Sequence, residues 1–321
     1  MGESSCMVVD FDEFCCGIHD ETREKMKQIP KSDLHNHAGR GGSITYLMQQ
    51  LDIEIIPPKE SFSNIESMDL WFKQNIQSKL PQGVENYLKR VEANLVSAKE
   101  NHVVSLALDF GIGEIYEMGG MENFIKIITN LNKLYAPDAK LHPVLTIREL
   151  RGLEYLEDIF SYKWFTAIDI INYKKDIPMD VLKIVCDFAK NNGLRCKAHI
   201  GEFGRAEDVW EYVSNLPLDD LQHGVKVVES SSILDKISKF NVVYNVCPAS
   251  NIMLEVCKDY KSHPIKKMLD FGLTVTLNTD DQLIFNTSIS DEYLNLFSSG
   301  ALNEKELYRV YCNGMRVYQT V

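Results

Sequence analysis

The amino-acid sequence predicts a single (β/α)8 barrel of the TIM type. Short apolar runs alternate with segments of helical periodicity, eight such runs can be counted, and polar residues follow the ends of several of them. The chain has 321 residues, while a barrel of this type needs about 250 and tolerates insertions. A doubly wound open sheet would show the same alternation, so the placement of the polar residues has to decide between the two folds.

The expected strands are short runs, most of them rich in apolar and β-branched residues. In chain order they are residues 33–37, 102–110, 141–147, 164–171, 194–200, 219–223, 241–247 and 273–279.

Helical periodicity predicts helices between and after these strands, and their ends carry typical signals. Pro178 suits the first turn of a helix, and Gly193 suits the position just after one. In chain order the expected helices are residues 84–100, 121–135, 148–160, 178–192, 205–215, 229–239, 262–271, 288–298 and 303–318.

Two segments lie outside the regular alternation. Residues 1–29 are expected to form an N-terminal extension, and residues 30–321 the barrel domain. Residues 43–83 form a long insertion after the first strand, with Trp71 and Phe72 among several aliphatic residues. An insertion above the strand ends commonly covers the active site of a barrel, so we expect it to act as a lid.

The composition is that of an ordinary globular protein, with 45% hydrophobic and 25% charged residues. The longest apolar runs, such as residues 103–108, are far shorter than the roughly 20 residues of a membrane helix, and we expect no membrane span. The acidic N-terminus lacks the features of a secretory signal, which predicts a cytoplasmic location. Eight cysteines without paired spacing indicate reduced thiols rather than a disulfide framework.

The formal net charge of −12 argues against binding a nucleic-acid polymer, because such binding needs clustered Lys and Arg. A small anionic ligand remains compatible with it, since one local site can be positive within an acidic protein. The expected partner is therefore a small molecule, and nothing in the sequence indicates the oligomeric state.

Five residues that commonly bind metals or catalyse hydrolysis stand at predicted strand ends. His35 and His37 are two residues apart in one strand, so their side chains share a face. His199 and His223 end the fifth and sixth runs, and Asp280 follows the eighth. Active sites of barrels lie at the carboxyl ends of the strands. Three imidazoles and one carboxylate suit Zn²⁺, with one position left for a water whose pKa the ion would lower.

Each of these residues alone has a simpler explanation. A single strand-end histidine is more often hydrogen-bonded within the core, and adjacent acids such as 280–281 usually form a turn or a helix N-cap. The order of HxH, HxGE, QHG and TDD along the chain makes coincidence improbable. The other histidines, His19, His102, His142 and His263, lack such a setting and are expected to be structural or exposed.

Over residues 30–300 the chain resembles the adenosine deaminase family of the amidohydrolase superfamily. The matching segments are 30-PKSDLHNH-37, 199-HIGE-202, 222-QHG-224, 247-CPASN-251, 277-LNTDD-281 and 291-DEY-293.

The resemblance implies one Zn²⁺ per chain, held by His35, His37, His199 and Asp280. It also implies three catalytic residues. Glu202 would donate a proton to N1 of the purine, which makes the ring electrophilic. His223 would orient the attacking water, and Asp281 would contact that water or the purine N7.

At the substrate-binding positions the sequence matches the family in some places and departs from it in others. Gly201 would let the backbone approach the ligand, and Asn172 stands near a position whose backbone N–H meets purine N3 in the family. Gly39 replaces an aspartate that adenosine-specific members often use to contact the ribose 5′-hydroxyl. Arg40, followed by two glycines, could cradle an anion, or this segment could be a tight loop.

The sequence therefore predicts hydrolytic deamination at C6 of an adenine nucleoside or nucleotide, with release of ammonia. Two alternatives remain open. One is a metal-dependent phosphoester hydrolase, which commonly uses two metals and a bridging lysine, for which Lys197 is the candidate. The other is a non-catalytic relative that binds purine nucleosides.

Overall fold

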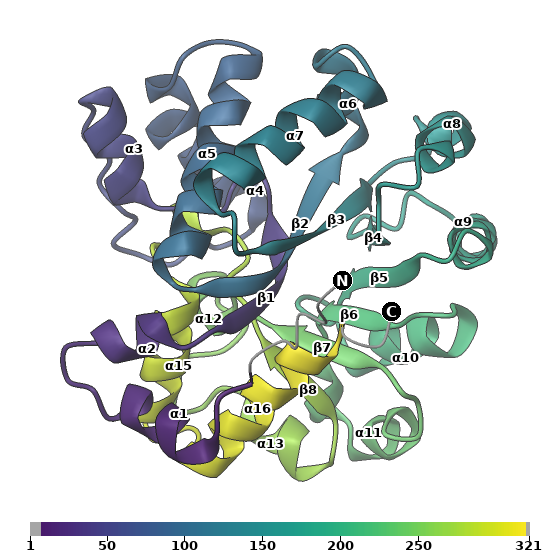
Figure 1. Ribbon diagram of the computed structural model, residues 1–321. Coiled ribbons are helices and arrows are strands. Elements are labelled where there is room, and N and C mark those ends of the chain that lie inside the picture. Colours follow the sequence, from purple (N-terminus) through teal and green to yellow (C-terminus); the bar gives the residue numbers. More distant parts are fainter. Residues whose placement is uncertain (1–7, 319–321) are drawn as a thin grey trace, which may run out of the picture.

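The computed structural model describes residues 8–318 and contains one sheet of eight parallel strands in sequence order. Figure 1 shows the strands at the centre with helices around them, and the predicted (β/α)8 barrel is confirmed. The strands are β1 Lys31–His37, β2 Val103–Gly111, β3 Lys140–Ile147, β4 Ala167–Ile171, β5 Arg195–Ile200, β6 Asp220–His223, β7 Val243–Val246 and β8 Thr274–Leu277. Between β8 and β1 the pairing is one parallel bridge, Asn36 with Asp280.

Helices cover the outside of the strands, and each β-strand is followed by at least one. They are α5 Val84–Glu100, α6 Ile112–Glu117, α7 Met121–Tyr135, α8 Leu156–Ser161, α9 Met179–Asn191, α10 Ala206–Asn215, α11 Ser231–Ile237, α12 Pro248–Met253, α13 Ile265–Asp270, α14 Gln282–Phe285, α15 Ile289–Ser298 and α16 Glu304–Arg316, with 3-10 turns η2 Leu153–Tyr155 and η3 Val225–Glu229.

One predicted helix is wrong in its first part. Residues 148–151 are an exposed loop after β3, and regular structure starts only at Leu153, after Gly152, whose φ is 98°. A left-handed residue interrupts a right-handed helix, so helical periodicity alone placed the boundary too early. The short helices α6, α12 and α14 were not predicted, because four to six residues show too little periodicity.

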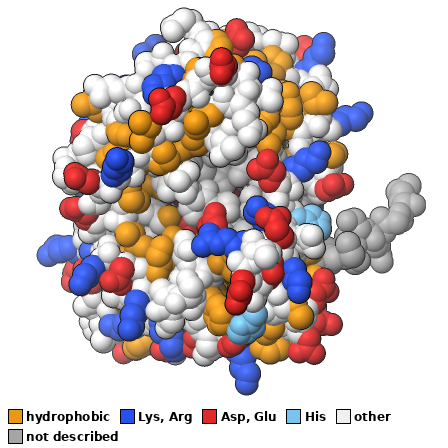
Figure 2. Space-filling model, turned by 90° about the vertical axis from the view of Figure 1, so that its left-hand side faces the viewer, with side chains coloured by type: hydrophobic (Ala, Val, Ile, Leu, Met, Phe, Trp, Pro, Cys, Tyr) orange, Lys and Arg blue, Asp and Glu red, His pale blue; other side chains and the backbone are white. Residues whose placement is uncertain are grey.

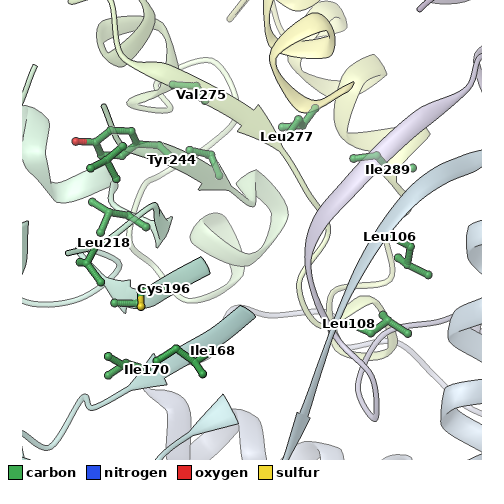
Figure 3. Packing of buried hydrophobic residues seen from close by; sticks show 14 of the residues in the cluster. Leu106, Leu108, Ile168, Ile170, Cys196, Leu218, Tyr244, Val275, Leu277 and Ile289 are labelled. Atoms are coloured by element: carbon green, nitrogen blue, oxygen red, sulfur yellow. The ribbon is translucent and has the colours of Figure 1, made fainter. Parts of the chain in front are cut away.

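The two faces of the strands differ in chemistry because side chains alternate between them. Outward-facing residues such as Leu106, Leu108 and Ile168 pack against the helices, and Figure 3 shows part of this apolar layer. The inner face carries polar side chains from five strands, all of them fully buried. These are Asp169, Lys197, Gln222, Asn245 and Thr276. The inner face can therefore hold a polar site.

The insertion after β1 packs over the carboxyl ends of the strands. It contains α3 Ile44–Leu51, α4 Ile65–Asn75 and η1 Gln77–Lys79. Its apolar residues, among them Leu47 and Phe72, form one cluster with Leu254 after β7 and Leu283 after β8. The insertion thus roofs the end of the barrel where the candidate site lies. That it opens and closes as a lid stays a prediction.

The segment before β1 contains two helices, α1 Phe11–Ile18 and α2 Glu24–Gln28. They lie beside α15 and α16 in Figure 1. Phe14 of α1 is buried and its ring meets those of Tyr293 and Tyr311 at 5.9 and 5.1 Å. Residues 8–29 thus share the core of the barrel helices. Residues 1–7 of the predicted extension lie outside the described residues, and the boundary at residue 29 stays a prediction.

The surface in Figure 2 mixes basic and acidic side chains with apolar ones and has no continuous basic area on that face. Within residues 8–318, no helix is both long enough and apolar enough to cross a bilayer. The cytoplasmic location stays a prediction.

Candidate metal and catalytic site

The four predicted metal ligands come together at the carboxyl ends of β1, β5 and β8. His35 and His37 enter from β1, His199 from β5 and Asp280 from the loop after β8. Potential ligand atoms of the three histidines all lie within 4.8 Å of one another. Asp280 Oδ1 is 3.3 Å from His37 Nε2 and 3.6 Å from His35 Nε2. These distances are compatible with a metal site formed by these side chains.

The protonation state of His35 and His37 fits a metal. Burial and the neighbouring imidazoles lower the pKa of His35 and His37 well below the usual range, which favours the neutral form that binds metal. Both ring nitrogens of His35 are buried and find no hydrogen-bond partner within residues 8–318. Buried polar atoms without partners are costly, and a metal ion would satisfy His35 Nε2.

Two aspartates that the sequence analysis did not select lie behind the histidines. Asp169 of β4 is 3.1 Å from His199 Nδ1, and Asp109 of β2 is 3.7 Å from the Nδ1 atoms of both His35 and His37. Burial and the Asp169 carboxylate raise the pKa of Asp109, whereas His199 lowers that of Asp169 in spite of its burial. A carboxylate hydrogen-bonded to an imidazole fixes the ring and its tautomer, which applies to Asp169 and His199, whereas Asp109 makes no hydrogen bond to either ring. Both aspartates were visible in the sequence as acids within apolar strands.

Asp169 is itself held by a belt of hydrogen bonds around the inside of the barrel. We call these residues the polar belt. The bonds join β4 to β6 across β5, β6 to β7, β7 to β8, and the loop after β8 to both β8 and β1, with distances from 2.7 to 3.1 Å. The donors and acceptors in order are Asp169, Gln222, Asn245, Thr276, Asn278 and the backbone N–H of Leu34. The belt therefore links the support of His199 to the strand that carries His35 and His37.

Replacing Asp169 by Asn is expected to weaken metal affinity by about 10- to 100-fold. Asn keeps the shape but removes the negative charge that orients His199 Nδ1–H and makes the ring a better ligand. Competition with a chelator, followed by metal analysis, measures the change. Asp187→Asn on the exposed side of α9 is the control. Equal metal affinities for Asp169→Asn and wild type would show that His199 needs no carboxylate behind it.

Glu202 lies in the loop after β5 and is buried beside the candidate ligands. Its Oε1 is 3.6 Å from His223 Nε2, and it accepts hydrogen bonds from Tyr173 Oη at 2.8 Å and Ser250 Oγ at 3.2 Å. Burial raises the pKa of Glu202 to about 7. A carboxyl group with such a pKa can hold and release a proton near neutral pH, as general acid catalysis requires.

His223 and Asp280 have left-handed backbone conformations, which residues other than glycine rarely adopt. Their φ angles are 68° and 61°, in the left-handed region that costs free energy for a non-glycine residue. The backbone turns at these positions bring the side chains together, with His223 Nε2 3.8 Å from Asp280 Oδ2. Asp281 follows immediately, and its Oδ1 is buried without a hydrogen-bond partner within the described range. Strain of this kind tends to be retained where it serves a site.

Three cavities meet at this end of the barrel. A metal-facing cavity of about 110 Å³ is lined by His37, His199, Glu202, His223, Asp280 and Asp281 together with insertion residues Met68 and Asp69. A second of about 330 Å³, the arginine cavity, contains Arg40, Arg90, Arg148 and Arg151. A third of about 680 Å³ is lined by Asn172, Tyr173 and Phe203. Arg148 lines all three.

Arg40 does not present a free guanidinium. It forms ion pairs with Asp69 at 2.6 Å and with Asp281 at 3.3 Å. The backbone N–H groups of residues 40–42 also bond within the protein, to His37 O and to the side chain of Gln282. The tight-loop interpretation of this segment therefore accounts for its donors, and the predicted anion cradle would have to displace them.

The other predicted substrate positions differ in their access. Gly39 lines the arginine cavity. Asn172 lines the third cavity, with its side chain engaged by Ile177 and Tyr212. Gly201, with φ of 74°, packs against Gly224, where an added Cβ would approach Cα to 3.0 Å. Gly201 lines none of the three cavities, so it serves a close backbone contact.

The fold and this cluster define a barrel hydrolase with its candidate metal site at the carboxyl ends of the strands. A sequence model of the adenosine deaminase family matches residues 148–318. An adenosine deaminase of Clostridium acetobutylicum is 36% identical over 317 residues, which cover 91% of this chain and 94% of the relative. An adenine deaminase of Marinomonas sp. is 33% identical over 316 residues, covering 91% and 92%.

Among solved structures, an amidohydrolase from Burkhoderia ambifaria with bound Zn is similar to this chain, with a TM-score of 0.71 and 20% sequence identity. The match covers 92% of this chain and 87% of the amidohydrolase chain. The chain belongs to the adenosine deaminase family, and it is a hydrolase that acts on carbon–nitrogen bonds. The predicted membership of this family is thereby confirmed.

Proposed function

We propose that this enzyme removes the 6-amino group of an adenine nucleoside or nucleotide by hydrolysis, with one Zn²⁺ held by His35, His37, His199 and Asp280. The observation that carries the proposal is the convergence of these side chains beside Glu202. The related adenosine deaminase of Clostridium acetobutylicum and adenine deaminase of Marinomonas sp. support the reaction class. The zinc-bound amidohydrolase supports the choice of metal.

A bound zinc ion would lower the pKa of a coordinated water and so supply a nucleophile near neutral pH. The chain's own groups would do the rest. Glu202, with its pKa near 7, protonates the ring nitrogen N1 as C6 is attacked. His223 faces the same space and donates a hydrogen bond to the attacking oxygen. Asp281 Oδ1, which has no other partner among the described residues, accepts one from the substrate or the water.

The two-metal phosphoesterase is the less favoured function. Its bridging lysine would have to be Lys197, but Lys197 Nζ donates to the backbone carbonyl of Leu34 at 2.9 Å and lies over the ring of Tyr318. The side chain therefore points away from the metal-facing cavity, which it does not line. Metal analysis distinguishes the two, because deamination needs one zinc per chain and the alternative needs two.

For the sugar and any phosphate of the substrate, we assign the arginine cavity. Arg148 and Arg151 make no ion pair or side-chain hydrogen bond within residues 8–318, whereas Arg40 and Arg90 are already engaged. Arginine offers a planar fork of donors that fits a phosphate. Lys73 from the insertion lines the same cavity. Because Arg148 also lines the metal-facing cavity, one ligand can reach both.

The test is a substrate panel of adenine, adenosine, deoxyadenosine and AMP, followed by the spectral change to hypoxanthine and by ammonia release. If Arg151 binds a phosphate, Arg151→Gln is expected to lower the ratio of kcat/KM for AMP to that for adenosine by about tenfold or more. Arg205→Gln, with a 76% exposed side chain outside the three cavities, is the control. An unchanged ratio would remove the phosphate from this cavity, and no turnover of any purine would refute the deaminase.

A further inference from the structure

A chain of three hydrogen bonds connects His223 to the start of a helix on the outside of the barrel. The backbone N–H of Ile265 lies 3.1 Å from His263 Nδ1. His263 Nε2 lies 3.2 Å from Asn251 Oδ1, and Asn251 Nδ2 lies 3.3 Å from His223 Nδ1. Asn251 belongs to α12, directly after β7, and His263 precedes α13. All three side chains are buried, with exposed fractions of 3% or less.

The direction of these bonds follows from one fixed donor. A backbone N–H can only donate, so His263 Nδ1 must accept, and the single proton of the neutral ring sits on Nε2. Burial lowers the pKa of His263 to about 3, which keeps the ring neutral. His263 Nε2–H then donates to Asn251, so the oxygen of the amide must face it. The amide nitrogen consequently faces His223 and donates to Nδ1.

We infer that Asn251 and His263 are positioning residues that fix His223 as the tautomer with its proton on Nε2. That proton points into the metal-facing cavity, where His223 Nε2 lies 3.6 Å from Glu202 and 3.8 Å from Asp280. In this form His223 can donate a hydrogen bond to an oxygen at the site, but it has no free lone pair there to remove a proton. His223 thus stabilises charge that develops on the oxygen, while Glu202 handles the proton.

A purely structural role for His263 would leave the tautomer of His223 undetermined. From the sequence alone His263 is expected to be structural or exposed, because no motif surrounds it. The connection depends on α12, which begins at Pro248 and carries Asn251 toward both histidines. The turn before α13 brings the Ile265 N–H back onto the His263 ring. Helix α12 and the turn before α13 thus determine which ring nitrogen of His223 carries the proton, although His263 does not itself line the metal-facing cavity.

The tautomer is measured directly by long-range ¹H–¹⁵N NMR of the zinc-loaded protein labelled with ¹⁵N-histidine. The His223 signals are assigned by their loss in His223→Gln. We expect wild type to carry the proton on Nε2. In Asn251→Asp, which presents only acceptors, the proton is expected to move to Nδ1. A proton on Nδ1 in wild type, or on Nε2 in Asn251→Asp, would overturn the inference whatever the enzyme's activity.

The effect on turnover rests on the proposed deamination and is measured separately. With the wrong tautomer, kcat for Asn251→Asp is expected to fall by about 10²- to 10⁴-fold, with zinc content unchanged and KM changed less than kcat. His263→Gln keeps an N–H donor toward Asn251 and is expected to retain more activity than His263→Met, which has none. Equal kcat values for these two variants would contradict the role of His263. If wild type deaminates no purine but shows the expected tautomer, only the proposed function fails.

Discussion

Glu202→Gln is expected to lower kcat for the best purine substrate by about 10²- to 10⁴-fold, with the metal content unchanged. Gln fits the same space, and its single oxygen can accept from one of the two hydroxyls, Tyr173 Oη or Ser250 Oγ, which lie at 2.8 and 3.2 Å from different oxygens of the Glu202 carboxyl, while its NH2 group can donate to the other. It cannot release a proton to the purine ring. The large effect thus comes from the loss of proton transfer alone.

Steady-state kinetics and metal analysis on the same sample check this prediction. Glu207→Gln, in α10 and largely exposed, is the matched control and should behave as wild type. Near-normal turnover in Glu202→Gln would exclude Glu202 as the acid. A loss of metal in parallel with turnover would mean that Glu202 supports the ion rather than the proton transfer.

Asp280→Asn is expected to remove the metal and with it almost all activity. The carboxylate lies within 3.3 to 3.8 Å of His37, His35 and His223, and we propose it as the anionic ligand of the metal. Asn keeps the size and tolerates the left-handed φ of 61°, which separates the lost charge from backbone strain. We expect metal affinity to fall by more than about 100-fold, beyond the effect of a residue behind a ligand.

Metal analysis after dialysis against a chelator, together with circular dichroism, measures this outcome. The control is Asp235→Asn, at an exposed position of α11. A variant that keeps one zinc per chain would show that three histidines suffice and that Asp280 has another role. A variant that loses its fold would instead point to the single bridge between Asn36 and Asp280 that joins β8 to β1.

The barrel could be predicted because its regular alternation is written into short segments. All eight expected strands overlap observed ones, since a buried parallel strand is a short apolar run bounded by turns. The prediction was weakest where a tertiary contact decides. The composition of residues 148–151 is typical of a helix. In the structure these residues form the loop after β3, and Arg148 in this loop lines the metal-facing cavity.

The candidate metal ligands could also be predicted from the sequence, because each lies in or just after a predicted strand and has a side chain that commonly binds metals. Asp109 and Asp169 could have been found, since an acid within an apolar strand needs a partner. Tyr173 and His263 could not, and neither could the role of Asn251, although its segment 247-CPASN-251 matches the family. Their importance arises from contacts between loops that are far apart in the sequence, and neither periodicity nor composition encodes such contacts.

The polar belt has a consequence for protein engineering. A designer who grafted the four candidate ligands onto another barrel would obtain the right side chains at the right strand ends, but without the buried amides and hydroxyls that extend from Asp169 to Leu34. A partly satisfied polar interior is worse than an apolar one. The smallest transferable unit therefore consists of the four candidate ligands together with the whole polar belt. A graft that omits the belt should bind metal weakly or fold poorly.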